Sequence, residues 1–248
     1  MTDTPCRFGL VVTGKGEEEF LHILFRSLMA RAYCFFTVIR RVGQRSPITA
    51  PKKMLKMTGT NRRLPTKDEE EIGLPVLMFL RRNPGSYAII VDDLEGARRG
   101  VADAVFARYR TALDEALGPP GLTSRAAVHF LVNMLEAYYF ADSRAVNQVA
   151  GSRVIAADYP TDVEQIGHPK YQLKQSWPGF DEKAHGGPVL KLLDIERVLS
   201  RSAECCWLRA MFAWCVAKLL AADAIHDTSL CTAFCLTDGC QAPTTSGQ

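Results

Sequence analysis

Short apolar segments alternate with amphipathic segments along the first 150 residues of the chain. Runs of apolar, β-branched or aromatic residues predict four strands, over Phe8–Thr13, Phe35–Val42, Tyr87–Val91 and Ala126–Val132. Apolar residues at helical spacing predict helices that follow each strand, over Glu17–Ala32, Asp68–Arg82, Gly100–Leu117 and Met134–Val149. This alternation predicts an α/β fold with a mostly parallel, Rossmann-like sheet flanked by helices.

The chain after Gly151 follows a different pattern. Asp162–Phe180 is rich in turn-forming residues and predicts irregular structure, whereas Asp194–Ser200 and Glu204–Ala222 predict helices. The last residues are small and polar, which is typical of a frayed terminus. We therefore expect three parts: an α/β domain over 1–150, a mainly helical and partly irregular extension packed on it over 151–236, and a disordered tail over 237–248.

The charges are unevenly distributed along the chain. Between Phe20 and Lys67 there is no Asp or Glu, and without the eleven Lys and Arg of this stretch the net charge of +3 becomes −8. Gly43–Lys67, within it, lacks periodicity and predicts a long basic loop. A basic segment beside an acidic remainder is typical of a face that binds a polyanion, although a solvated loop without a partner has the same composition.

Length and composition favour a folded cytoplasmic protein. The 248 residues are 47% hydrophobic, which suffices for a buried core, and no apolar run is long enough to cross a bilayer. The N-terminus lacks the pattern of a secretory signal. Most of the eight cysteines are expected to be reduced in the cytoplasm, and the spacing of Cys231, Cys235 and Cys240 does not match the tight pair of a zinc knuckle.

Carboxylates follow three of the predicted strands. Ligands of parallel sheets bind beyond the carboxyl ends of the strands, where the sequence places Glu17, Asp92, Asp93, Glu95 and Glu136. Carboxylates are the hard oxygen ligands that Mg²⁺ prefers, and an ion held there would polarise a bound phosphate. The Gly14-Lys15-Gly16 turn before Glu17 lacks the spacing of a phosphate-binding P-loop.

Each of these carboxylates also has a structural interpretation. Glu17 stands in an acidic first helical turn and could simply stabilise the helix N-terminus. Asp92 and Asp93 could form a solvated turn that caps the next helix. Glu136 could form a structural salt bridge with an arginine such as Arg98. His168, which precedes a proline, is more readily explained as a turn residue than as a catalytic one.

Taken together, three motifs carry a family resemblance. The Gly-Lys-Gly-Glu turn after the first strand, YAIIVDDLEG and VHFLVNMLEAYYFAD resemble the Toprim-like family, specifically the bacterial proteins of the DUF4276 type, over about Phe8–Asp142. The resemblance implies a Toprim-like sheet that binds Mg²⁺ (or Mn²⁺) through Glu17, Asp92 and Asp93, with Glu95 and Glu136 as further catalytic candidates. The family usually has Glu where this chain has Thr13, so either Glu17 has taken over or the domain only binds.

The resemblance implies a Mg²⁺-dependent nuclease that cleaves phosphodiesters, working with an ATPase partner in bacterial defence against foreign DNA. The cations expected to hold nucleic-acid phosphates without reading sequence are Lys15, Arg45, Lys52, Lys53, Lys56, Arg62, Arg63, Arg98, Arg99 and Lys170. Two alternatives remain open: a catalytically inactive module that binds nucleic acid or a partner protein, and a phosphatase-like enzyme on small substrates, which would not need the basic segment. The sequence leaves open whether the protein forms a homo-oligomer.

Overall fold

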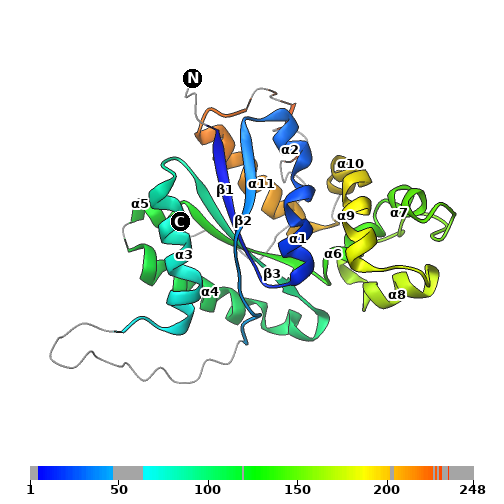
Figure 1. Ribbon diagram of the computed structural model, residues 1–248, viewed down its shortest axis with the longest axis horizontal. Helices are drawn as coiled ribbons and strands as arrows, with labels where there is room; N and C mark the ends of the chain where they lie inside the picture. Colours follow the sequence, from blue (N-terminus) through cyan, green and yellow to red (C-terminus); the bar gives the residue numbers. More distant parts are fainter. Residues whose placement is uncertain are drawn as a thin grey trace.

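A four-stranded parallel sheet forms the centre of the molecule (Figure 1). The computed structural model describes residues 5–46, 64–118, 120–201 and 204–225, together with residues 227, 229, 230 and 234. The strand order is β2-β1-β3-β4, and each neighbouring pair is parallel, with strands β1 (Cys6–Val12), β2 (Cys34–Arg41), β3 (Tyr87–Leu94) and β4 (Ala126–Val132). The predicted α/β fold with a parallel sheet is confirmed.

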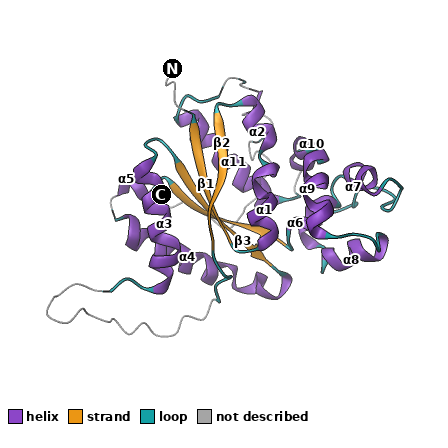
Figure 2. Cartoon of the chain, in the orientation of Figure 1, coloured by secondary structure: helices purple, strands orange, loops and turns teal. Residues whose placement is uncertain are grey.

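Helices pack against both faces of the sheet (Figure 2). One face is covered by α1 (Lys15–Leu24), α2 (Arg26–Arg31) and α11 (Cys206–Ala221). The opposite face is covered by α3 (Leu74–Arg82), which follows a π-helical turn over Glu69–Gly73, and by α4 (Ala102–Leu117), which follows a 3₁₀ turn over Gly96–Val101. Burial on both faces explains why β3 and β4 are apolar almost throughout.

Shorter elements complete the described chain. They are α5 (Pro120–Thr123), α6 (Leu135–Tyr139), α7 (Ser143–Ala150), a 3₁₀ turn over Val163–Gln165, α8 (Pro169–Ser176), α9 (Glu182–Leu192) and α10 (Ile195–Leu199). Helices α6 to α10 gather beside α1 (Figure 1). Residues from α9, α10 and α11 share one hydrophobic cluster with residues of β1 and β3.

Several predicted elements were wrong in detail. The helix expected over Glu17–Ala32 is divided at Phe25, whose buried ring stacks on Phe36 of β2 with centroids 4.0 Å apart. The helix expected over Met134–Val149 is likewise two helices, α6 and α7. Tertiary packing decides these breaks, because the local pattern of apolar residues continues across them.

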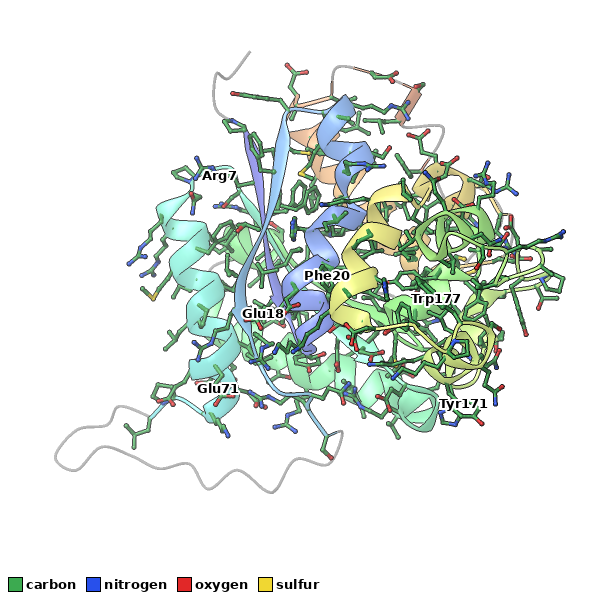
Figure 3. The ribbon with its side chains drawn as sticks, turned by 45° about the vertical axis from the view of Figure 1, so that its right-hand side comes forward. Arg7, Glu18, Phe20, Glu71, Tyr171 and Trp177 are labelled. Carbon is green, nitrogen blue, oxygen red and sulfur yellow. The ribbon has the colours of Figure 1, made fainter. Side chains whose placement is uncertain are left out.

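Helices α8 and α9 were not predicted. Helix α8 lies inside the segment that was expected to be irregular, and α9 contains Gly186, Gly187 and Pro188, which all disfavour a helix interior. A Cβ atom at Gly187 would lie 3.0 Å from the Phe20 ring of α1, so the small residues allow α9 to pack closely against α1. Figure 3 shows Phe20 on the side of α1 that faces α9.

Some sequence predictions fall outside the part of the chain that the structure describes. These are the expected tail over 237–248 and the three cysteines Cys231, Cys235 and Cys240. Cys6, Cys34, Cys205 and Cys215 are free, buried thiols. No helix within the described residues has the length and apolar character needed to span a membrane.

Glu164 connects the first turn of α11 to α6. Its buried carboxylate accepts hydrogen bonds from the Tyr138 hydroxyl (2.9 Å) and from the backbone N–H groups of Leu208 (3.1 Å) and Trp207 (3.2 Å). Two otherwise unpaired N–H groups of the helix N-terminus are thereby satisfied, and the negative charge lies at the positive end of the helix dipole.

We expect Glu164→Gln to lower the free energy of unfolding by about 1–3 kcal/mol, because an amide has only one acceptor atom and leaves a buried backbone N–H unpaired in either orientation. Urea denaturation should be measured above pH 7, since burial raises the pKa of the Glu164 carboxyl to about 7. The exposed neighbour Gln165→Ala serves as control and should change stability by less than about 0.5 kcal/mol. Equal effects of the two substitutions would refute this role.

Candidate acidic pocket at the carboxyl ends of the strands

The turn between β1 and α1 is shaped by two carboxylates. A Cβ atom at Gly14 would lie 1.7 Å from Oε2 of Glu17, and one at Gly16 would lie 2.6 Å from Oε1 of Glu182. The two carboxylates thus lie against the glycine backbone, and a side chain at either position would displace the carboxylate it meets. Glu17 is buried, whereas its neighbours Glu18 and Glu19 are exposed.

Strand β3 continues to Leu94, so Asp92 and Asp93 lie inside the strand and not in a loop after it. Successive residues of a strand point to opposite faces of the sheet. Asp92 points to the face covered by α3 and α4, whereas Asp93 points to the face covered by α1. The acidic pair therefore divides between two environments.

Asp92 is fully buried, and both of its carboxylate oxygens have partners. The Thr13 hydroxyl donates to Oδ1 (2.8 Å), while Oδ2 accepts from Arg98 (2.7 Å) and from the Tyr109 hydroxyl (3.2 Å). Thr13 also accepts a hydrogen bond from the Asp93 backbone N–H (3.2 Å), so it bridges β1 and β3. The salt bridge that the sequence suggested between Arg98 and Glu136 is formed instead between Arg98 and Asp92.

A cavity of about 360 Å³ lies on the other face of the sheet, at the carboxyl end of β1. Its acidic lining residues are Glu17 from α1, Asp93 from β3, Glu136 from α6, Glu182 from α9, and Glu95, which is exposed at the end of β3. We call this cavity the acidic pocket. Its first three carboxylates are at most 6% exposed, so the fold brings together buried acidic groups from three different elements.

Asp93 and Glu136 differ in their hydrogen bonds. Oδ1 of Asp93 accepts from the backbone N–H of Met134 at 3.0 Å. Oε1 of Glu136 is buried and has no hydrogen-bond partner among the described residues. Leaving a buried carboxylate oxygen unpaired costs free energy, so this atom is a candidate ligand for a bound cation.

The pocket raises the pKa of its carboxyl groups. Burial, and after it the negative charges of Glu17, Glu95 and Asp92, together raise the pKa of Asp93 to about 8. Burial raises the pKa of Glu136 to about 7, and it also raises that of Glu17. Lys170 forms an ion pair with Glu182 and offsets part of this negative charge. The pocket consequently favours binding of a proton or another cation.

The donor set fits a divalent cation, although a complete cage is not present. In the part of the chain described, no group of three or more His, Cys, Asp or Glu side chains is arranged to hold a metal ion. Three buried carboxylates around one cavity are nevertheless the oxygen ligands that Mg²⁺ and Mn²⁺ take, and one of their oxygens is unpartnered. Sharing one ion would require these carboxylates to draw closer together than they lie here.

The candidate phosphate-binding cations differ in whether they are held in internal ion pairs or lie at the surface. Arg45 pairs with Asp68 and Glu71, and Arg98 with Asp92, so both are held internally. Lys15 is exposed at the acidic pocket, and Arg99 donates to Gln165 at 2.8 Å. The remaining candidates of the basic segment fall outside the described residues: Lys52, Lys53, Lys56, Arg62 and Arg63.

Glu182 and the role of Thr13 were not predicted from sequence. Glu182 lies on α9, which the local pattern did not identify, and reaches Gly16 only because α9 packs against α1. From sequence alone, Thr13 stands out only because the resemblance places a carboxylate at its position. The signal that could have suggested its role is its position at the end of β1, where a hydroxyl can reach the neighbouring strand β3.

A parallel sheet with helices on both faces and an acidic pocket at the carboxyl ends of its strands defines a Rossmann-like α/β protein. The chain belongs to the family described as "Domain of unknown function (DUF4276)", whose model matches residues 12–213. The predicted relation to DUF4276-type proteins is thereby confirmed, while the wider Toprim-like relation stays a prediction. No curated protein and no solved structure matches the chain.

Proposed function

We propose that this protein is a divalent-metal-dependent phosphodiesterase that cleaves nucleic acid, with Glu17, Asp93 and Glu136 as the carboxylates that share the ion. The observation that carries the proposal is the buried, unpartnered oxygen of Glu136 in a cavity with two other buried carboxylates. Such a cluster disfavours the folded state unless protons or cations neutralise it, and strongly raised carboxyl pKa values are typical of functional sites.

The proposal changes the ligand set that the sequence suggested. Glu136 takes the place of Asp92 in the proposed ligand set. Both oxygens of Asp92 are already engaged by Thr13, Arg98 and Tyr109 on the far face of the sheet. Asp92 is instead a positioning residue, since its bonds hold the start of the glycine turn next to β3. Glu95 is exposed beside the pocket, where it would contact substrate or solvent.

The protein's own side chains would bind and orient the substrate. When bound, Mg²⁺ or Mn²⁺ would supply the positive charge that neutralises the carboxylates and polarises a phosphate. Lys15, and Lys170 after release from Glu182, would hold phosphate oxygens at the pocket. A pocket carboxylate would accept the proton of the attacking water, a role that a raised carboxyl pKa favours.

A cleavage assay with two neighbouring glutamates tests this proposal. We expect plasmid, single-stranded DNA or RNA to be cleaved with Mg²⁺ or Mn²⁺ and not with EDTA. Glu17→Gln should lower the rate by roughly 100-fold or more, because it removes a carboxylate from the pocket. Glu18→Gln is the matched control, since Glu18 lies in the same helical turn but is exposed and pairs with Arg41. The proposal fails if no substrate is cleaved, or if both variants cleave like the wild type.

Thr13 favours a second candidate, a catalytically inactive module that binds nucleic acid. The hydroxyl stands where the resemblance places a carboxylate, and it is already engaged by Asp92 and by the Asp93 backbone. Tight binding that weakens steeply with salt, without cleavage under any metal, would support this candidate. Participation in defence with an ATPase partner stays a further proposal, tested by co-purification with the ATPase encoded beside this gene, where there is one.

The raised pKa values predict that stability depends on pH and on divalent cations. The folded pKa values of Asp93 and Glu136 are about 8 and about 7, against ordinary values of 3.8 and 4.5 for exposed carboxyl groups. The folded state therefore holds more protons between these limits, and its stability should fall as pH rises from about 4 to about 8. Above about pH 8, Mg²⁺ or Mn²⁺ should replace the protons and raise the Tm.

Thermal unfolding followed by circular dichroism, with EDTA and with each cation, checks this prediction. We expect the cation-dependent rise in Tm to reach about 4 °C above pH 8 and to be absent at about pH 5, since about 1 kcal/mol changes Tm by about 2–4 °C in proteins of this size. A rise in Tm that is independent of pH would contradict the assignment to these carboxylates.

A further inference from the structure

A second cavity adjoins the acidic pocket. It has a volume of about 570 Å³, and Glu95 and Met134 line both cavities. Lys170, which pairs with Glu182 of the acidic pocket, also lines the second cavity and stands at the junction of the two. Cavities of this size hold small organic groups, so a substrate whose phosphate enters the acidic pocket can place a neighbouring group here.

The start of α8 forms much of the wall of this second cavity. His168 has a left-handed backbone (φ 51°, ψ 55°), which residues other than glycine rarely adopt, and Pro169 begins the helix directly after it. Tyr171 and Lys174 follow at a spacing of three, which places them on neighbouring positions of one helix face. The sharp turn thus presents an aromatic ring and a cation at the same cavity.

The lining groups combine apolar, aromatic and polar character. Tyr171 lines the cavity and is 63% exposed, so its ring is accessible to a ligand, and Figure 3 shows it at the edge of the molecule. Met134 and Pro169 add apolar surface. Asn133 donates through Nδ2 to the Glu164 carbonyl, which fixes its amide, and its Oδ1 lies 3.6 Å from where a Cβ atom of Gly96 would stand, at the cavity wall.

Resting on the phosphodiesterase function proposed above, we propose that the second cavity binds one unpaired nucleobase next to the scissile phosphate. The base would stack on Tyr171, and its exocyclic amine would donate to Oδ1 of Asn133. Lys174 would contact the adjoining phosphate. An exposed aromatic ring beside lysines is the combination that single-stranded nucleic-acid sites use, and a base inside a duplex does not offer its face to a side chain. The substrate is therefore single-stranded nucleic acid or an unpaired end.

Binding in EDTA tests this inference without requiring cleavage. Fluorescence anisotropy should be measured with a labelled oligodeoxycytidylate, with an abasic strand of the same length, and with the corresponding duplex. We expect the oligodeoxycytidylate to bind about tenfold tighter than the abasic strand, because only it can stack on Tyr171. Free cytidine monophosphate is the competitor that distinguishes a site for a single nucleotide from a site for a strand.

Substitutions at Tyr171 test whether the base-dependent part of binding comes from stacking on this ring. Tyr171→Ala should weaken binding of the oligodeoxycytidylate by about 5- to 100-fold and leave the abasic strand unchanged, whereas Tyr171→Phe should stay within about twofold of the wild type. Phe35→Ala is the matched control, since Phe35 is similarly exposed, at 54%, but lies on edge strand β2. Tyr171 is exposed, so these variants are expected to fold.

The outcomes separate this inference from the proposed function. Equal binding of the abasic strand and the oligodeoxycytidylate, or an unchanged Tyr171→Ala variant, overturns the base-binding cavity even if the wild type cleaves DNA with Mg²⁺. Base-dependent binding through Tyr171 without cleavage under any metal supports the cavity and overturns the phosphodiesterase. Competition by free cytidine monophosphate as strong as that by the oligonucleotide overturns the assignment to a strand.

Discussion

Arg98→Ala is expected to lower the free energy of unfolding by about 3–5 kcal/mol, because it leaves the Asp92 carboxylate buried without its positive partner. The guanidinium also donates to the backbone carbonyls of Asp93 (2.7 Å) and Arg45 (2.9 Å), so its removal separates three segments that meet at the end of β3. Urea denaturation measures the loss.

Arg99→Ala is the matched control for this prediction. Arg99 is the next residue in the chain, but it donates to the exposed side chain of Gln165, whereas the ion pair with Asp92 is formed by Arg98. The Arg99→Ala substitution should change the free energy of unfolding by less than about 0.5 kcal/mol. In the Arg98→Ala background, Asp92→Asn should recover part of the loss by removing the buried charge. Similar losses in the two alanine variants would show that the ion pair is not important for stability.

The same ion pair affects how variants of Asp92 are interpreted. Asp92→Ala would leave Arg98 without its carboxylate partner and would release Thr13 at the start of the glycine turn. A loss of cleavage in that variant would therefore not identify Asp92 as a metal ligand. Variants of Glu17, Asp93 and Glu136 test the proposed ligands without disturbing this pair.

Glu136→Gln is expected to reduce metal-dependent cleavage by roughly 100-fold or more and at the same time to raise the Tm above pH 8. The two effects have one cause, since the carboxylate that would bind the ion is buried with an unpartnered oxygen and is costly to ionise when no cation is present. An amide of nearly equal size removes that charge. Cleavage rates and thermal unfolding in EDTA, measured on the same preparation, check both effects.

Glu19→Gln serves as the control for the removal of one negative charge, because Glu19 is exposed on α1. It should alter neither cleavage nor Tm appreciably. A variant of Glu136 that cleaves like the wild type would remove it from the proposed ligand set. A fall in its Tm would instead indicate that the carboxylate makes a stabilising contact, which is the structural interpretation of this residue.

The sequence by itself determined the fold class and the neighbourhood of the candidate site. Four apolar runs separated by helical patterns are sufficient to predict a parallel sheet, because only that arrangement buries both the strands and the apolar faces of the helices. The carboxyl ends of parallel strands meet at one edge, so the sequence placed Glu17, Asp92, Asp93, Glu95 and Glu136 near that edge.

Only the tertiary structure decided which carboxylates share the pocket. Asp92 and Asp93 are adjacent in the chain, but β3 extends past them, and strand alternation sends one to Arg98 and the other to the cavity. Glu182 joins the pocket because α9 packs on α1, a contact between segments far apart in the chain. The local sequence pattern indicates which face of a helix or strand is apolar. The partner of each charged side chain depends instead on packing between segments that are far apart in the chain.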